Sequence, residues 1–450
     1  MRAADAARSA GPALAAAADP ALEATPAAGP AADAAPVTAG RRRWIALAAC
    51  VAASLCAGIG YAWSVFQKPL AEGAGWSTSD IALSFTALLG AGAVASIVAG
   101  KAQQYVKPRT VILVGGALIG AGLVCLGFVH SLAGVYGFSF LAGFGMGFVY
   151  PGGTMTNVIR FFPDRRGMAS GILTAGYGVG GVVCAPLAAA LIGRYGLTTT
   201  LVVLGAVFFV AIALSSRLVY TAPHIDDHEE PLVDVPAVDG DDTAADLDWR
   251  GMLCTADFYV LFALFVAGTF SGMMVLGHAS PIAQQILGLS PQAAGMVVSF
   301  VALGMVLGKV GWGSLSDRMG RYPVFAAMLV VAALALVVLS QATASFSVVL
   351  ALATVGLCYG GFLSLIGPVT ADAFGARHLG VNFGIMFLTI AVSAYAGPRL
   401  AAQVAEANGG SFSQAFVIAA VINLAGLALV AVHVLLRRRR EAVAALEPSC

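Results

Sequence analysis

The sequence predicts an all-α membrane protein of about twelve transmembrane helices, arranged as two six-helix halves. Three observations support this prediction: the composition, the spacing of the apolar runs and an internal repeat. Of the 450 residues, 59% are hydrophobic and only 10% are charged, and the mean hydropathy is +0.88. Soluble proteins carry roughly 25% charged residues, so most of this chain must be surrounded by lipid. The composition therefore excludes a soluble enzyme.

Apolar runs long enough to cross a membrane occur twelve times along the chain. A membrane-spanning helix needs about 20 mostly apolar residues. Six such runs precede an acidic gap and six follow it: 44–66, 79–100, 110–130, 134–159, 168–193 and 198–220, then 254–278, 290–312, 323–343, 346–371, 381–403 and 411–436. We therefore expect one helical bundle over residues 44–220 and a second over residues 251–436.

The segments outside these bundles differ in composition. Residues 1–43 are rich in Ala and Pro and lack the basic-then-apolar order of a signal peptide, so we expect a disordered cytoplasmic tail. Residues 221–250 are acidic and contain Pro, which is typical of a flexible cytoplasmic linker. Residues 437–450 are expected to form a second cytoplasmic tail. Seven scattered cysteines, without a CxxC pair or a Cys/His cluster, indicate neither a metal site nor a disulfide framework.

The basic residues predict the orientation of the chain. If both termini are cytoplasmic, all but four of the 24 Lys and Arg residues fall on the cytoplasmic side; the exceptions are Lys68, Arg194, Lys309 and Arg399. An excess of Lys and Arg in cytoplasmic loops is the rule for membrane proteins. We therefore expect a multi-pass protein of a bacterial-type inner (plasma) membrane. The net charge of +1 gives no sign of a nucleic-acid partner.

A loop that follows the second predicted span recurs after the eighth. The first copy begins at Gly100 and the second begins 213 residues later, at Gly313. The same offset carries Gly167 onto Gly380, at the starts of the fifth and eleventh spans. Two separate segments that agree on one offset indicate a duplication. Parallel six-helix halves are an architecture found among membrane transporters.

The second copy of this loop, Gly313-Ser-Leu-Ser-Asp317-Arg318-Met-Gly-Arg321, resembles the signature loop of the major facilitator superfamily. The resemblance implies the major facilitator fold and a gating role for the loop. Gly313 permits a close backbone approach, and Asp317, Arg318 and Arg321 can form ion pairs across the cytoplasmic helix ends. The alternative is a basic loop that only sets the topology. In the first copy Gln104 stands where an Asp is expected, so that side of the gate is expected to be weaker.

Further segments are similar to the oxalate/formate antiporter family, which shares features with monocarboxylate carriers. They are Gly60-Tyr61-Ala-Trp63, Tyr150-Pro151-Gly-Gly, Phe161-Phe-Pro-Asp164 and Gly277-His278-Ala-Ser280. The resemblance covers roughly residues 44 to 436. It implies a secondary transporter of small organic carboxylates that works by alternating access, with antiport as the expected mode. It implies no enzymatic chemistry, cofactor or metal, and we expect a monomer whose partners are a small organic anion and the lipid bilayer.

The family resemblance also places the expected cations. Carriers of this family have a cationic residue on helix eight, and the oxalate carrier also has a lysine on helix eleven. In this sequence the corresponding positions are Lys309 and Ile390. A charge inside the bilayer costs about 2.5–3.5 kcal/mol, so Lys309 is a candidate for substrate binding, unless it snorkels to cytoplasmic water. Without the second cation, a monocarboxylate such as formate, lactate or glycolate is favoured over oxalate. Arg399 could move inward to assist, or could snorkel at the outer surface.

Aromatic residues are the candidates for the walls of a substrate pocket. A phenol offers an apolar face together with a hydrogen-bond donor for a carboxylate. Tyr359 resembles an aromatic position of the family's substrate cavity, whereas a neighbouring family tyrosine is Leu363 here. The alternative for any one of these residues is anchoring at the membrane interface. The full set of candidates is Tyr61, Trp63, Tyr150, Tyr177 and Tyr359.

The acidic residues bear on the coupling mode. Asp80, Asp257 and Asp372 lie near the ends of predicted spans, and no Asp or Glu falls deeper inside one. Proton-driven symporters usually need a membrane-embedded carboxylate or histidine, so exchange or facilitated flux is favoured. His278, which is expected near the outer surface, could still carry a proton. A proton-coupled monocarboxylate symporter and a non-transporting membrane sensor therefore stay open as alternatives.

Overall fold

The computed structural model describes residues 35–74, 76, 78–220, 246–341 and 344–444. The first 34 residues of the predicted tail and most of the predicted linker lie outside the described residues. Within the described residues the chain forms helices joined by short connections, and no strand. The predicted all-α fold class is confirmed.

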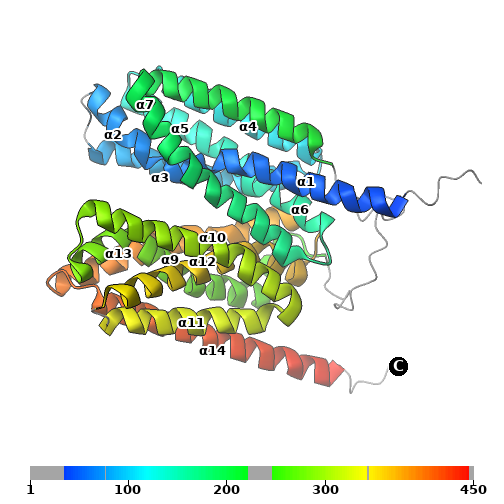
Figure 1. Cartoon of the computed structure of the whole chain (residues 1–450). Coiled ribbons are helices and arrows are strands. Elements are labelled where there is room, and N and C mark those ends of the chain that lie inside the picture. Colours follow the sequence, from blue (N-terminus) through cyan, green and yellow to red (C-terminus); the bar gives the residue numbers. More distant parts are fainter. Residues whose placement is uncertain (1–34, 75, 77, 221–245, 342–343, 445–450) are drawn as a thin grey trace, which may run out of the picture.

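Figure 1 shows two bundles that lie side by side, one built from the first half of the chain and one from the second. The first half contains α1 (Ala35–Ala57), η1 (Gly58–Ala62), α2 (Ser64–Ala74), α3 (Thr78–Ala102), α4 (Pro108–Leu126), α5 (Leu132–Gly147), η2 (Phe148–Gly153), α6 (Met155–Phe161) and α7 (Arg166–Leu218). The second half contains α8 (Trp249–Leu253), α9 (Ala256–Leu287), α10 (Pro291–Met319), α11 (Arg321–Gln341), α12 (Ser345–Phe374), α13 (Leu379–Ala407) and α14 (Ser413–Ala444).

Eleven segments of the described chain are long and apolar enough to cross a membrane, whereas twelve spans were predicted. The difference lies in α7, whose 53 residues would extend about 80 Å as a straight helix. That is far more than the roughly 30 Å hydrocarbon core of a bilayer. Gly196 interrupts α7 with a φ of 79°, which favours glycine, and the chain folds back there (Figure 1). The two arms of α7 therefore correspond to the predicted fifth and sixth spans, and with α7 divided in this way the described residues contain the predicted twelve.

Two spans contain irregular backbone near their middle. The first passes from α1 through η1 into α2, and the fourth passes from α5 through η2 into α6. Tyr61 lies in η1, and Tyr150 in η2 has a non-helical backbone (φ −135°, ψ 127°). Irregular backbone at membrane depth is tolerated where it is buried in protein or lines a cavity. At these breaks Tyr150 is buried within the first half, whereas Tyr61 is 43% exposed.

The two halves meet through glycines that the repeat relates to one another. Gly100 on α3 packs on the backbone of Gly380 on α13, and Gly313 on α10 packs on the backbone of Gly167 on α7. A Cβ atom at any of these four positions would collide with backbone atoms of the opposite half. The offset read from the sequence therefore corresponds to a two-fold relationship in space, with α3–α13 and α7–α10 as the matching contacts.

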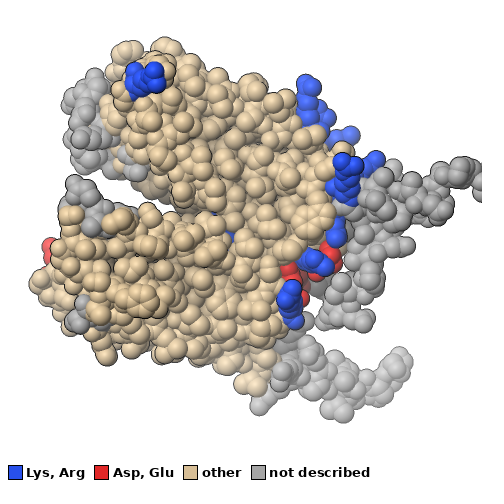
Figure 2. All heavy atoms as spheres, in the orientation of Figure 1, with Lys and Arg blue, Asp and Glu red and all other residues tan. Residues whose placement is uncertain are grey.

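The charged residues gather at one end of the molecule. Figure 2 shows Lys and Arg side chains clustered where α1 begins, and Figure 1 shows α14 ending on the same side. We call this the basic end and define it by Arg43, Arg109, Arg166, Arg321 and Arg377. Figure 2 also shows a cleft between the halves that opens at the other end. The rest of the visible surface is largely uncharged, as a lipid-facing surface requires.

Candidate substrate site and gate

Lys309 lies between the two halves. It belongs to α10, its side chain is 1% exposed, and its Nζ donates a hydrogen bond to the carbonyl oxygen of Thr174 on α7 at 3.0 Å. The backbone of Lys309 packs against Gly171 of α7. Its Nζ lies beside Gly178, further along the same helix, because a Cβ added to Gly178 would lie 2.9 Å from that nitrogen. Seven residues of helix separate these levels, a rise of about 10 Å. Since α7 begins at the basic end, the ammonium points away from that end and toward the middle of the protein.

The ammonium of Lys309 has no carboxylate partner among the described residues. An ammonium carries three donors, and Thr174 is the one acceptor that the described chain provides. A lysine that snorkels would extend toward the water at the basic end, opposite to the observed direction. A buried lysine without a counter-ion is costly to keep charged in a membrane, and an anion would supply that counter-ion. The site is therefore suited to receive an anion.

Three tyrosines of the first half form one aromatic cluster. Tyr150 and Tyr177 stack with ring centroids 4.4 Å apart, and Tyr61 meets Tyr177 edge-on at 5.3 Å. Tyr177 precedes Gly178 on α7, so the cluster adjoins the level that the ammonium of Lys309 reaches. Stacked phenols provide a flat apolar wall with hydroxyl groups at its edge.

The second half supplies an apolar wall. Tyr359 on α12 is 3% exposed, packs against Gly272 and directs its hydroxyl to the sulfur of Met273 at 3.5 Å. It forms a buried cluster with Met305 and Leu363, and Ile390 packs on this cluster. Tyr359 also lies within electrostatic range of Tyr61 and Tyr150, across the boundary between the halves.

Three other candidate residues lie elsewhere. Trp63 is fully buried and donates from Nε1 to Ser84 Oγ at 3.1 Å, which fixes it inside the first half. Arg399 donates to the hydroxyl of Tyr395, a side chain that is 68% exposed. His278 contacts the carbonyl of Met274 at 3.3 Å and the ring of Phe412 at 5.4 Å. The described contacts bring none of these three side chains to Lys309.

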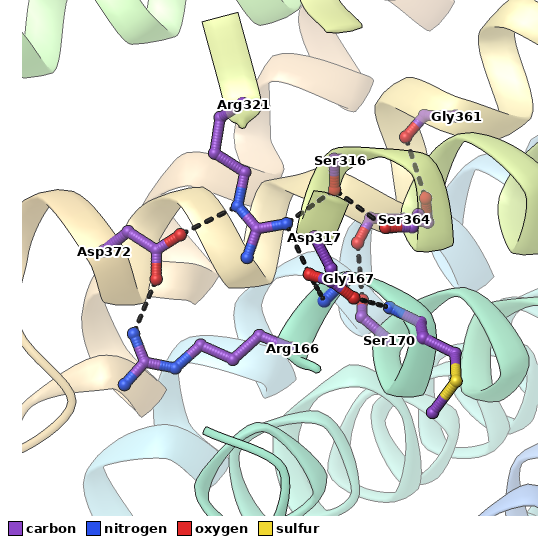
Figure 3. A network of polar contacts seen from close by, with 11 residues as sticks. Arg166, Gly167, Ser170, Ser316, Asp317, Arg321, Gly361, Ser364 and Asp372 are labelled. Carbon is purple, nitrogen blue, oxygen red and sulfur yellow. Dashed lines mark hydrogen bonds and ion pairs between the residues drawn. The ribbon is translucent and has the colours of Figure 1, made fainter. Parts of the chain in front are cut away.

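Asp317 holds the two halves together at the basic end (Figure 3). Its carboxylate accepts hydrogen bonds from the backbone N–H groups of Gly167 at 2.8 Å and Met168 at 2.7 Å, in the first turn of α7. The N-terminus of a helix carries free N–H groups and a partial positive charge, so it attracts a carboxylate. Asp317 therefore caps a helix of the opposite half.

Ion pairs extend this contact into a network. Arg321 pairs with Asp317 and with Asp372, both at 2.8 Å, and Arg166 of the first half pairs with Asp372 at 2.5 Å (Figure 3). Arg318, which was expected to share in these pairs, is exposed and pairs with no described carboxylate. Arg166 and Asp372 were not expected as gate residues. Their charge and their position at helix ends were visible in the sequence, but the pairing between halves was not.

A further contact closes the basic end next to this network. Ser170 Oγ on α7 donates to the carbonyl oxygen of Ser364 on α12 at 2.5 Å. Together with the glycine contacts, this hydrogen bond brings the halves together at the basic end, while the cleft opens at the other. A helical membrane protein with two related halves, a buried cation between them and an ion-paired closure at one end has the architecture of an alternating-access transporter.

The chain belongs to the Major Facilitator Superfamily, whose family model matches residues 47–278 and 260–448. It is 28% identical over 397 residues to the oxalate:formate antiporter of Oxalobacter formigenes, covering 87% of this chain and 91% of that protein. It is 25% identical over 331 residues to monocarboxylate transporter 13 of Rattus norvegicus, covering 71% of this chain and 72% of that protein. The predicted similarity to the oxalate/formate and monocarboxylate carriers is confirmed.

Solved structures agree on the fold. The E. coli transporter FucP in its outward conformation superposes with a TM-score of 0.67 at 13% identity, covering 87% of this chain and 99% of that one. The human organic anion transporter MFSD10 superposes with a TM-score of 0.63 at 13% identity, covering 86% and 99%. The protein is thus a multi-pass membrane protein that belongs to a family of transporters.

Proposed function

We propose that this transporter carries small monocarboxylates by alternating access and that Lys309 binds the substrate carboxylate. The observation that carries the proposal is the position of Lys309, which is buried between the halves, directed toward their middle and without a carboxylate partner in the described chain. An anion that enters the cleft would replace the Thr174 carbonyl as the acceptor for this ammonium. A charge-assisted hydrogen bond contributes about 1.5–3 kcal/mol.

The surroundings of Lys309 favour one negative charge over two. Tyrosines of the first half offer hydroxyl donors, whereas the second half presents Tyr359, Leu363 and Ile390. The apolar side suits a hydrogen, methyl or hydroxymethyl group, as in formate, lactate or glycolate. Oxalate would direct its second carboxylate toward these apolar residues, at a desolvation cost. Its transport would need a further cation, and Arg399 is held at Tyr395 instead.

The same geometry favours exchange. In this structure the Nζ of Lys309 is held by the carbonyl of Thr174 on the opposite half. An empty transporter that changed state would break this hydrogen bond and move an unneutralised charge, which costs a few kcal/mol within a membrane. A bound carboxylate neutralises the charge and lowers this cost. We therefore propose antiport, with the basic end toward the cytoplasm and the cleft open to the outside.

Counterflow in liposomes tests this function. Protein reconstituted with internal formate or lactate should take up the labelled acid rapidly, and liposomes without internal acid should take up little. Uptake driven by an inward proton gradient, without internal acid, would instead support the proton-coupled symporter. Lys107→Gln, which removes an exposed lysine from the basic end, is the matched control for Lys309→Gln and should exchange normally.

A further inference from the structure

A pocket of about 210 Å³ lies at the basic end, on the side of the molecule related by the repeat to the Asp317 network. Both halves contribute to its lining. Its lining includes Gln103, Gln104, Arg160, Arg377, His378 and Gly380. The pocket lies away from Lys309, and the proposed transport cycle does not use it.

Comparison of the two repeats shows that this pocket lacks a carboxylate to cap the adjacent helix. Gln104 is the counterpart of Asp317, and Gly380 is the counterpart of Gly167. Asp317 places its carboxylate on the first turn of α7, but Gln104 does not do the same for α13. Its Oε1 accepts from Lys101 at 2.7 Å and its Nε2 lies 3.3 Å from His378 Nδ1. The first turn of α13 has no side-chain cap.

The charges around the pocket are mostly positive. Arg160 donates from Nη2 to the carbonyl oxygens of Ala376 and Arg377 at 3.0 Å each, which holds its guanidinium at the pocket. Lys101 lies beside Gln104, and Arg377 lines the pocket. The carboxylate facing this group is Asp246, which accepts from the backbone N–H of Arg377 at 3.2 Å and lies within electrostatic range of Arg160.

A buried acceptor in the pocket defines the ligand further. Gln103 is 7% exposed and donates from Nε2 to the carbonyl oxygen of Gly152, while its Oε1 accepts no hydrogen bond from any described residue. Leaving such an acceptor unsatisfied costs about 1–3 kcal/mol. A ligand that fits must therefore bring a hydrogen-bond donor for Gln103 as well as negative oxygen atoms for the helix terminus and the arginines.

We propose that this pocket binds a small oxyanion that also carries a hydroxyl group, such as hydrogen phosphate or a 2-hydroxycarboxylate. Its negative oxygens take the place of the missing carboxylate on the first turn of α13, as anions do at helix N-termini, and its hydroxyl donates to Gln103 Oε1. Gln103 and Arg160 belong to one half and His378 and Gly380 to the other. The site is therefore complete only while the basic end is closed, and its ligand stabilises that state.

Phosphate binding to a variant without the central cation tests this site independently of transport. Purified Lys309→Gln should bind radiolabelled inorganic phosphate saturably at pH 7. Adding Arg160→Gln should weaken binding at least about tenfold, because a charge-assisted partner is lost. Adding Gln104→Asp should abolish it, because the new carboxylate occupies the first turn of α13. Arg217→Gln, an exposed arginine at the same end, should leave binding unchanged.

Further measurements separate the possible sources and guard against misfolding. Sulfate, which lacks a hydroxyl at pH 7, should bind more weakly than phosphate. Gln104→Asp should raise the melting temperature without phosphate and remove its further rise with phosphate. If phosphatidylglycerol displaces phosphate in nanodiscs and Arg160→Gln removes that competition, a lipid headgroup fills the same site. The proposal would be overturned if phosphate did not bind saturably, or if its binding were unchanged by both Arg160→Gln and Gln104→Asp.

Discussion

The carboxylate of Asp317 lies 2.8 Å from the backbone N–H of Gly167, across the boundary between the two halves. The contact depends on two features together. Gly313 and Gly167 let α10 and α7 approach until a side chain on one reaches the first turn of the other. Arg321 then fixes the orientation of the carboxylate. A loop that resembled a family signature in the sequence is thus a helix cap supplied from the opposite half.

Asp317→Asn should weaken this closure. The substitution keeps the size of the side chain but removes the charge that Arg321 and the start of α7 attract. Hydrogen bonds to charged groups contribute about 1.5–3 kcal/mol, so the closed state should become about tenfold to a hundredfold less favoured. We expect slower exchange with normal membrane insertion, measured as counterflow per inserted protein. Arg318→Gln is the control. Equal exchange rates for the two variants would indicate that the loop only sets the membrane topology.

Gly171→Ala should separate the halves at the basic end by steric repulsion. A Cβ at this position would collide with the carbonyl of Lys309. Spin labels on the exposed Tyr105 and Arg318 positions, after replacement of the native cysteines, should report longer distances in the variant. Gly193→Ala, where a Cβ meets no atom within 4 Å, is the matched control. A distance distribution that matches the control would show that this glycine contact does not set the closed state.

Ile390→Lys should raise the affinity for oxalate. Ile390 packs on the cluster of Tyr359 and Leu363, where a second ammonium would meet the second carboxylate of a dianion. A charge-assisted contact predicts a gain of about tenfold or more relative to formate. The measurement is the concentration of oxalate that half-inhibits formate exchange. Ile390→Met controls for side-chain length, and the same oxalate affinity in both variants would place the substrate elsewhere.

Epitope tags test the proposed orientation. Tags after Ser131, Gly288 and Asn408 should be reachable only from outside the cell, and a tag after Gly320 only from inside. The first three positions follow or precede helices at the end away from the basic end, and Gly288 and Gly320 are turn glycines with positive φ. A cytoplasmic tag after Gly288 would reverse the orientation on which the transport scheme depends.

The fold was largely predictable because hydropathy reports directly on lipid exposure. The spans followed from run length, and the break near Gly196 was visible as the gap between the runs 168–193 and 198–220. The repeat offset matched the Gly100–Gly380 and Gly167–Gly313 contacts. These features are local or periodic, so one sequence contains them.

The details of the site depend on tertiary packing, which one sequence does not contain. Arg166 and Asp372 pair because α7 and α12 meet at the basic end. The direction of Lys309 depends on the space that Gly178 leaves on the opposite half. Trp63 stands in the same motif as Tyr61, but the break at η1 directs it into the first half, toward Ser84. The spacing of these residues in the sequence does not predict these orientations.

Equilibrium binding of labelled formate or lactate to purified Lys309→Gln tests whether this lysine binds the substrate carboxylate, because binding does not depend on the transport cycle. If the ammonium pairs with the substrate carboxylate, affinity should fall about tenfold to a few hundredfold. Lys309→Arg, which keeps the charge, should retain part of it, and Lys107→Gln should bind normally. Unchanged affinity in a folded Lys309→Gln protein would show that the lysine between the halves has no part in binding the substrate.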